Sequence, residues 1–158
     1  MRTLLALLLL LATPAFAAEW GHYVNPRFGY AIDVPPGFAG QGEADNGDGQ
    51  VFTTPTARLT ASGGYIIEGS FEDAVAQAES DATDAGWNLS YQVSTPSNAS
   101  YSGSRGGRIL YARMIALCGD AYAGFWLEYS KADLVAFDAV VTRLVRSFHA
   151  TEGSAACP

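Results

Sequence analysis

Arg113 is the residue whose setting in this sequence most clearly indicates a binding chemistry. It stands in the middle of segment 108–117, which is otherwise apolar on both faces, where an unpaired charge would be costly. One hypothesis is that its guanidinium binds an anion in an aromatic cleft. The lining of that cleft would be Tyr111, Trp126 and Tyr129. The alternative is a structural cation–π contact with Trp126 or an ion pair with Glu128, according to the register of a hairpin with segment 122–129.

The other side chains that could do chemistry lack the spacing that catalysis requires. His22 and His149 stand near opposite ends of the chain, outside any HExxH or HxH pattern. The serine-nucleophile signature G-x-S-x-G is also absent. We therefore predict no catalytic residue and no cofactor. An enzyme built on this sequence would have to use carboxylates that converge in one pocket, with Asp33, Glu68 and Glu128 as the candidates.

The acidic segment 43–49, EADNGDG, is the one metal candidate. It offers hard oxygen ligands of the kind that calcium takes, on Glu43, Asp45 and Asp48. An EF-hand alignment fails, because Ala44 falls at the first ligand position. Asn-Gly and Asp-Gly pairs supply the positive φ angles of a tight reversal. We therefore predict a solvated turn without a metal, and keep calcium as the alternative.

Residues 1–17 have the three parts of a secretory signal peptide. Arg2 gives the positive start, residues 4–12 form an apolar run, and Ala15-Phe16-Ala17 gives the small-x-small cleavage pattern. The apolar run is shorter than the roughly 20 residues that span a bilayer. The prediction is a single exported domain over residues 18–158, periplasmic or secreted and not inserted in a membrane.

The charge balance excludes one class of partner. Without Arg2, 8 basic residues face 16 acidic ones, which gives a formal net charge of −8. A field of this sign repels nucleic acid, and the basic residues form no cluster. Cys118 and Cys157 form an even pair, which in an oxidising compartment predicts a disulfide between the C-terminal tail and the turn at 118–121.

Alternation of apolar and polar residues predicts a series of short strands. The expected ranges are 30–34, 50–54, 57–62, 65–67, 87–94, 101–105, 108–117 and 122–129. Segment 87–94 shows the clearest alternation, with Trp87, Leu89, Tyr91 and Val93 on one face. Segments 108–117 and 122–129 are apolar on both faces, so both faces should be covered.

Two helices are predicted from capping residues and helical periodicity. Ser70 and Asp73 form a capping-box pair that opens the first helix, which Gly86 ends. Ser130 and Asp133 play the same part for the second, whose apolar positions are 134, 137, 141, 144 and 148. The predicted fold class is α+β: an α/β/α sandwich with a mostly antiparallel sheet and one helix on each side.

Several segments resemble a group of small exported proteobacterial proteins of unknown function. They are YVNPRFGYAIDVP at 23–35, NGDG at 46–49, the stretch 101–111 that begins with YSG and ends with RILY, and VVTRLVRSF at 140–148. The order of elements is similar to that of the superfamily of PsbP, the extrinsic P-subunit of photosystem II, which also includes a Ran-binding nuclear-import factor. The resemblance implies the sandwich fold and an accessory or binding role. It assigns no functional residue.

These observations favour an exported, non-catalytic accessory or binding module whose partner is a protein or a small molecule. Aromatic side chains would supply its contact area. Two other functions stay open: a small carboxylate-dependent periplasmic enzyme, and a structural component of the envelope. The first requires convergent carboxylates, and the second requires a large exposed apolar patch.

Overall fold

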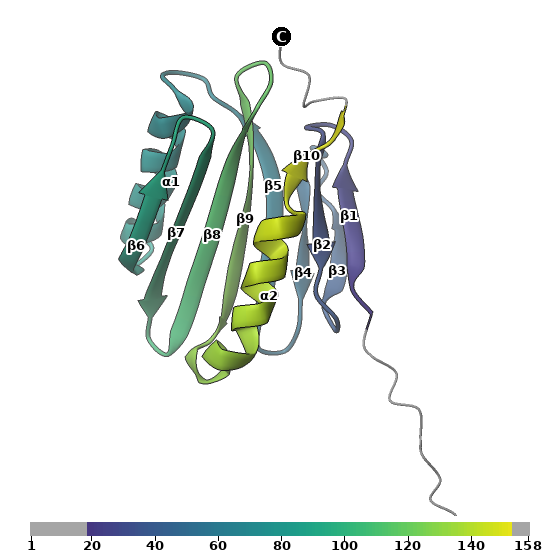
Figure 1. Ribbon diagram of the computed structural model, residues 1–158, viewed down its shortest axis with the longest axis vertical. Coiled ribbons are helices and arrows are strands. Elements are labelled where there is room, and N and C mark those ends of the chain that lie inside the picture. The colour runs from purple at the N-terminus through teal and green to yellow at the C-terminus, as the bar shows by residue number, and fades with distance from the viewer. Residues whose placement is uncertain (1–18, 153–158) are drawn as a thin grey trace, which may run out of the picture.

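The computed structural model describes residues 19–152 (Figure 1). In this part of the chain the strands are β1 (Gly21–Asn25), β2 (Tyr30–Val34), β3 (Ala39–Glu43), β4 (Gly49–Thr53), β5 (Arg58–Tyr65), β6 (Asn88–Ser94), β7 (Asn98–Arg105), β8 (Arg108–Leu117), β9 (Ala121–Ser130) and β10 (His149–Ala150). The helices are α1 (Phe71–Asp84), the 3-10 turn η1 (Lys131–Asp133) and α2 (Leu134–Ser147). The predicted signal peptide, residues 1–17, lies outside the described residues. Within them, no helix has the length and apolar character needed to cross a membrane.

Seven strands form one antiparallel sheet in the order β3-β4-β5-β9-β8-β7-β6. The long hairpin of β8 and β9 lies at its centre, and its two strands pair over ten residues each. A second, three-stranded sheet has the order β1-β2-β10. The α+β class predicted from the sequence is confirmed.

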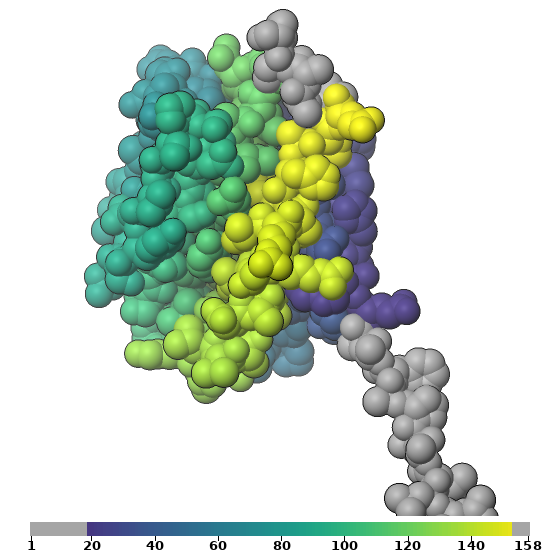
Figure 2. Space-filling model, viewed as in Figure 1, coloured from purple at the N-terminus to yellow at the C-terminus, as the bar shows by residue number. Residues whose placement is uncertain are grey.

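The elements form three layers, with the seven-stranded sheet in the middle. In Figure 1, α1 lies behind this sheet near β6 and β7, while α2 crosses its front. The small sheet lies beside α2 on the front, and Figure 2 shows α2 and β10 between the β6–β7 side and β1. Each covered face has its own apolar core: Phe71, Val75 and Tyr101 belong to the α1 side, and Phe125 and Leu144 to the α2 side. The prediction of one helix on each side is confirmed.

The small sheet was not predicted from the sequence, which placed all strands in one sheet. β1 and β2 form a hairpin near the start of the described residues. The two residues of β10, which follow α2, pair with Ala31 and Tyr30 of β2. Side chains of this hairpin enter the core on the α2 side, where Tyr30 and Ile32 are fully buried. The α2 layer is therefore part helix and part sheet.

Helix α1 begins as predicted. The Ser70 hydroxyl accepts a hydrogen bond from the backbone N–H of Asp73 at 3.2 Å, and the Asp73 carboxylate accepts one from the backbone N–H of Ser70 at 2.7 Å. This reciprocal capping box satisfies two backbone donors that a helix start leaves unpaired. Gly86, with φ +88°, follows the helix end in the left-handed conformation that glycine favours.

The start of the second helix differs from the prediction. The Ser130 hydroxyl accepts from Ala132 N–H and so caps the 3-10 turn η1. The residue at the N-cap of α2 is Asp133, whose side chain forms no capping hydrogen bond. The predicted Ser130–Asp133 capping box is therefore wrong, because one 3-10 turn separates the serine from the α-helix. The predicted apolar face is confirmed toward the C-terminal end, where Leu144 and Phe148 are buried, and is wrong at its start, where Leu134 is 48% exposed.

Two strand predictions are corrected by pairing. The expected strand 57–62 is part of a longer strand, β5, which pairs with β9 without interruption from Arg58 to Tyr65. The separate strand expected at 65–67 is wrong, because Tyr65 is the last residue of β5 and residues 66 and 67 lie in no strand. In β6, a bulge between Leu89 and Tyr91 reverses the alternation. Leu89 packs on the α1 side, whereas Tyr91 is 48% exposed and pairs with Ser102, which belongs to the opposite face. The single apolar face predicted for 87–94 is therefore wrong beyond Leu89.

Candidate ligand-binding groove

A groove of about 650 Å³ lies between α1 and the middle of the large sheet. Its wall is a row of short side chains at helical spacing on α1, namely Ala74, Ala78 and Ala82. Its floor carries three aromatic side chains from neighbouring strands: Tyr101 of β7 and Tyr122 and Trp126 of β9. Tyr122 and Trp126 share one face because alternate residues of a strand point to the same side. Because the alanine side chains of α1 are short, space remains between the helix and the aromatic floor of the groove.

A hydrogen bond organises this floor. The indole Nε1 of Trp126 donates to the hydroxyl oxygen of Tyr101 at 2.7 Å. The Tyr101 side chain is fully buried, and burial raises its pKa to about 12, against a lowering effect of the indole hydrogen bond. Burial also raises the pKa of Tyr122. Both phenols therefore keep their protons at neutral pH and remain able to donate a hydrogen bond.

Polar side chains form the rim of the groove on both sides. On α1, the Gln77 amide donates to the Asp81 carboxylate at 2.7 Å. On the sheet, Arg58 of β5 lies directly opposite Glu128 of β9 in the strand register. Glu128 is also 3.9 Å from the guanidinium of Arg108. The Glu128 carboxylate therefore lies close to one guanidinium, that of Arg108, while Arg58 Nε donates to Thr60 Oγ1 at 3.3 Å.

The four residues predicted to form an anion site do not share one cleft. Arg113 pairs with Phe125 in the strand register and lies on the α2 side of the sheet, as do Tyr111 and Tyr129. Trp126 pairs with Ala112 and faces α1. The proposed lining is corrected accordingly, because successive residues of a strand point to opposite faces and Trp126 and Tyr129 are three positions apart in β9.

Arg113 makes its polar contacts with β7. Its guanidinium donates to Ser100 Oγ at 3.2 Å and to Asn98 Oδ1 at 3.0 Å. Its Nε is buried and, among the described residues, has no hydrogen-bond partner. Neither Trp126 nor Glu128 is among these contacts. The cation–π contact or ion pair predicted for Arg113 is therefore replaced by hydrogen bonds to two neutral acceptors, Ser100 and Asn98. Anion binding by Arg113 stays a prediction.

Tyr111 and Tyr129 line a second, smaller groove beside α2. Its volume is about 470 Å³, and Leu134, Val135, Asp138 and Val141 complete its lining. The Tyr129 ring stacks on Phe137 with 4.3 Å between ring centroids. Tyr129 therefore serves mainly to hold α2 on the sheet, and its role in binding stays a prediction.

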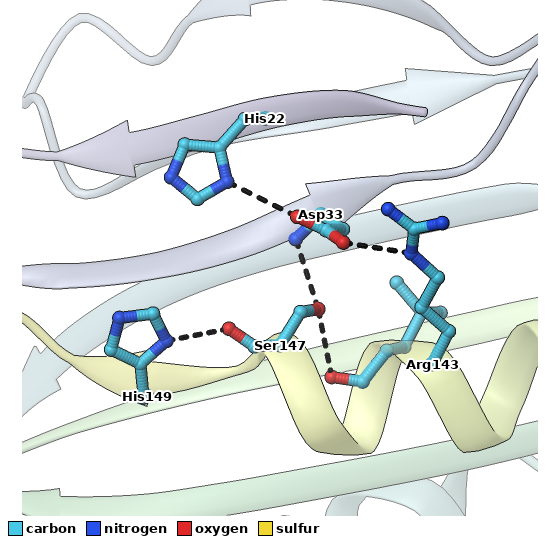
Figure 3. A network of polar contacts seen from close by, with 6 residues as sticks. His22, Asp33, Arg143, Ser147 and His149 are labelled. Carbon is cyan, nitrogen blue, oxygen red and sulfur yellow. Dashed lines mark hydrogen bonds and ion pairs between the residues drawn. The ribbon is translucent and has the colours of Figure 1, made fainter. Parts of the chain in front are cut away.

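The three candidate catalytic carboxylates lie in different parts of the fold. Glu128 is at the rim of the α1 groove, and Glu68 is exposed in the loop before α1. Asp33 is in β2, where it accepts a hydrogen bond from Arg143 Nε at 2.8 Å and lies 3.2 Å from His22 Nδ1 (Figure 3). Three carboxylates so placed do not form the convergent pair that acid–base catalysis would need.

Figure 3 also shows a serine and two histidines around Asp33, but they are not arranged as a nucleophile and its base. The Ser147 hydroxyl accepts from the backbone N–H of Asp33 at 3.1 Å and lies 3.3 Å from the carbonyl of Leu144, to which it donates. His149 Nδ1 is 2.7 Å from the backbone oxygen of Ser147. No imidazole activates the hydroxyl, so this network joins α2 to the small sheet.

The ion pair in this network gives a pH-dependent prediction. Partial burial disfavours the charged form of Asp33, but the hydrogen bonds from Arg143 and His22 outweigh it, so the pKa of the carboxyl lies below its usual value. A lowered pKa in the folded state stabilises the fold above the unfolded pKa of about 4, and this contribution is lost as the pH falls through the folded value.

We expect Asp33→Asn to be less stable than the wild type at neutral pH, with the difference disappearing in acid. Urea unfolding at a series of pH values measures it, with Asp45→Asn, an exposed residue of the acidic turn, as control. A difference between wild type and Asp33→Asn that stays constant down to low pH would contradict the assignment.

The acidic turn is held by hydrogen bonds to the small sheet. Glu43 accepts from the Tyr23 hydroxyl at 2.8 Å and from Asn25 Nδ2 at 3.0 Å, and Asp48 accepts from Asn46 Nδ2 at 2.8 Å. Among residues 19–152, no three His, Cys, Asp or Glu side chains are grouped so that they could hold a metal ion. The calcium alternative for Glu43, Asp45 and Asp48 thus gains no support, and Glu43 has a structural role.

Cys118 lies in the turn between β8 and β9, and it is not a free thiol. Its predicted partner, Cys157, lies outside the described residues. The bridge between them stays a prediction.

Sequence reasoning missed Arg58, Tyr101 and Tyr122 as groove residues. The alternation within segment 121–130 does place Tyr122 and Trp126 on one face and Tyr129 on the other, and this signal could have separated them. The pairing of Arg58 with Glu128 had no local signal, because it joins strands that are distant in the chain.

Comparisons with known proteins bear on the fold. No protein-family model and no curated protein matches this chain. The solution structure of cyanobacterial PsbP (CyanoP) from Synechocystis sp. PCC 6803 is similar, with a TM-score of 0.61 and 16% sequence identity, over 87% of this chain and 96% of that chain. The expected likeness to PsbP is thus confirmed for the fold, while membership of the small proteobacterial group stays a prediction. The chain has a PsbP-like fold.

Proposed function

We propose that this chain is an exported, non-catalytic binding module that holds its ligand in the groove between α1 and strands β5 and β9. The observation that carries the proposal is the groove itself. Its volume of about 650 Å³ falls within the range of roughly 300–1,000 Å³ typical of small-molecule sites. Its lining combines aromatic surface with a few polar groups, which is the composition that binds and orients a ligand.

The separation of the carboxylates supports a binding role over a catalytic one. Asp33 is engaged by Arg143 and His22 in the α2 layer, and Glu128 lies 3.9 Å from the guanidinium of Arg108. A general acid or base needs a partner group within reach of the same substrate atom. The groove offers hydrogen-bond donors and aromatic faces, which suit recognition better than proton transfer.

The exposed apolar side chains support a binding module over a structural envelope component. The large ones belong to separate segments: Val24 of β1, Tyr65 at the end of β5 and Ile67 after it, Tyr91 and Val93 of β6, and Leu134 and Val135 of α2. A structural component would present one extended apolar patch. The signal-peptide pattern of residues 1–17 supports export of the module.

Native mass spectrometry of the protein isolated from its own compartment tests the proposal. We expect the wild type to carry a bound small molecule and Trp126→Ala to lose it, because the floor of the groove is removed. Trp20→Ala is the matched control, since Trp20 packs against Arg143 on the α2 side. Circular dichroism establishes that both variants are folded. Equal ligand occupancy in the two variants, or no bound molecule in the wild type, would refute the groove as the site.

A further inference from the structure

The floor of the groove is flat because two glycines lie beneath its rings. A Cβ placed on Gly124 would be 2.6 Å from Trp126 Cη2, and a Cβ on Gly64 would be 2.8 Å from Tyr122 Cζ and its hydroxyl. Real Cβ atoms do not approach other atoms so closely, so any larger residue would lift each ring off the sheet. The two rings therefore lie along the sheet and present a face, rather than an edge, to the groove. A face of this kind stacks on a flat apolar surface of a ligand.

Two hydroxyl donors on this floor have no acceptor among residues 19–152. Tyr101 is fully buried and its oxygen accepts from Trp126, but within the described residues its own proton is not donated to any group. The same part of the chain provides no hydrogen bond for the Tyr122 hydroxyl. Tyr122 is only partly buried and lines the groove, so a ligand oxygen placed there can accept from its hydroxyl.

The charges around the groove do not select an ion. Arg58 and Glu128 face each other on the sheet side, and Arg108 lies 3.9 Å from Glu128. On the helix side, Asp81 is hydrogen-bonded by Gln77. Two cations, Arg58 and Arg108, thus stand against two carboxylates, Glu128 and Asp81, and this balance of net charge favours neither a cationic nor an anionic ligand. The rim instead offers amide, hydroxyl and balanced charged groups, which donate to and accept from a neutral polar molecule.

The position of the groove disfavours an extended peptide. Its floor strand β9 is interior and is hydrogen-bonded to β5 on one side and to β8 on the other. Peptides that bind as an added strand need the free backbone groups of a sheet edge. Here the edges are β3 and β6, so the groove can engage a ligand only through side chains.

We propose that the ligand of this groove is a neutral saccharide. Sugar rings combine an apolar C–H face, which stacks on an aromatic ring, with hydroxyl oxygens around the edge. Stacking would use Trp126 and Tyr122, the Tyr122 hydroxyl would donate, and the Gln77 amide would bind from the helix side. This inference rests on the proposed function, since it specifies the ligand of the same groove.

Titration with saccharides tests the inference. The probes are glucose, galactose, mannose, N-acetylglucosamine, maltose, cellobiose and diacetylchitobiose, with glucuronate and glucosamine as charged counterparts and a capped alanine peptide as the peptide arm. Binding is followed by the NMR signals of the indole N–H groups. We expect at least one neutral saccharide to bind and to shift the Trp126 signal. The charged counterpart of the same sugar should bind more weakly.

Tyr122→Phe is the decisive variant. It removes a hydroxyl without a protein partner, so the melting temperature should be unchanged, while the affinity for the saccharide should fall about 3- to 10-fold through loss of one hydrogen bond. Tyr91→Phe, an exposed tyrosine of β6 on the opposite face, should bind like the wild type.

Three results would overturn the saccharide inference. They are that no neutral saccharide binds, that Tyr122→Phe and Tyr91→Phe lose affinity for the saccharide equally, or that the peptide or a charged sugar binds best. If native mass spectrometry finds a bound molecule of another class that depends on Trp126, the proposed function stands and only the saccharide assignment fails. If Trp126→Ala retains all bound ligand, the groove itself is refuted.

Discussion

Asn25→Ala is expected to lower the free energy of unfolding by about 3–4 kcal/mol. Asn25 is fully buried between the β1–β2 hairpin and the acidic turn. Its Nδ2 donates to the Tyr23 hydroxyl at 3.1 Å, to Glu43 Oε1 at 3.0 Å and to the Gly47 carbonyl at 3.0 Å. Its Oδ1 accepts from the backbone N–H of Phe28 at 2.8 Å. Alanine would leave these groups without their partner in a site too enclosed for free hydration.

Urea unfolding measures this effect, and Asn46→Ala is the matched control. Asn46 lies in the acidic turn that Asn25 contacts, is exposed, and forms hydrogen bonds through its side chain with Asp48. We expect its replacement to cost less than about 1 kcal/mol. A cost for Asn25→Ala no larger than for Asn46→Ala would mean that the small sheet does not depend on this amide.

Gly124→Ala is expected to lower the free energy of unfolding by about 1–3 kcal/mol and to abolish ligand binding. Gly124 is buried, and the added methyl would occupy the place of the Trp126 ring, 2.6 Å from its nearest atom. The ring must then turn up into the groove and lose its hydrogen bond to the Tyr101 hydroxyl. One methyl group would thus disrupt both the packing around Gly124 and the aromatic floor of the groove.

A double-mutant cycle with Trp126→Ala isolates this contact. The three atoms nearest to the added methyl all belong to the indole, so Gly124→Ala should cost much less in the Trp126→Ala background. The coupling energy should therefore be about 1–2 kcal/mol, as found for residues in direct contact. Additive effects of the two substitutions would show that the ring does not lie over Gly124.

Local features of this fold were predictable because the signals lie within a few residues. The capping box of Ser70 and Asp73 fixes the start of α1 by short-range hydrogen bonds. The double-sided apolar pattern of β8 and β9 reflects their central position, where both faces are covered. The 3-10 turn after Ser130 escaped prediction because the same capping residue suits either kind of helix.

Long-range pairings were not predictable from one sequence. β10 is only His149 and Ala150, too short to show a pattern, and it exists because β2 offers a free edge. The β6 bulge turns Tyr91 to the opposite face with no residue that marks it. The groove likewise depends on the β5–β9 register, which brings Gly64 under Tyr122 and Arg58 beside Glu128.

The three tryptophans allow the most direct test of the groove as a binding site. Trp126 and Trp87 line it, whereas Trp20 lies with Arg143 on the other side of the fold. The measurement is the chemical shift of each indole N–H signal during titration with the molecule recovered from the native compartment. We predict that the Trp126 signal moves most, the Trp87 signal moves with the same binding constant, and the Trp20 signal stays fixed. A shift confined to Trp20, or one absent from Trp126, would contradict the assignment of this groove.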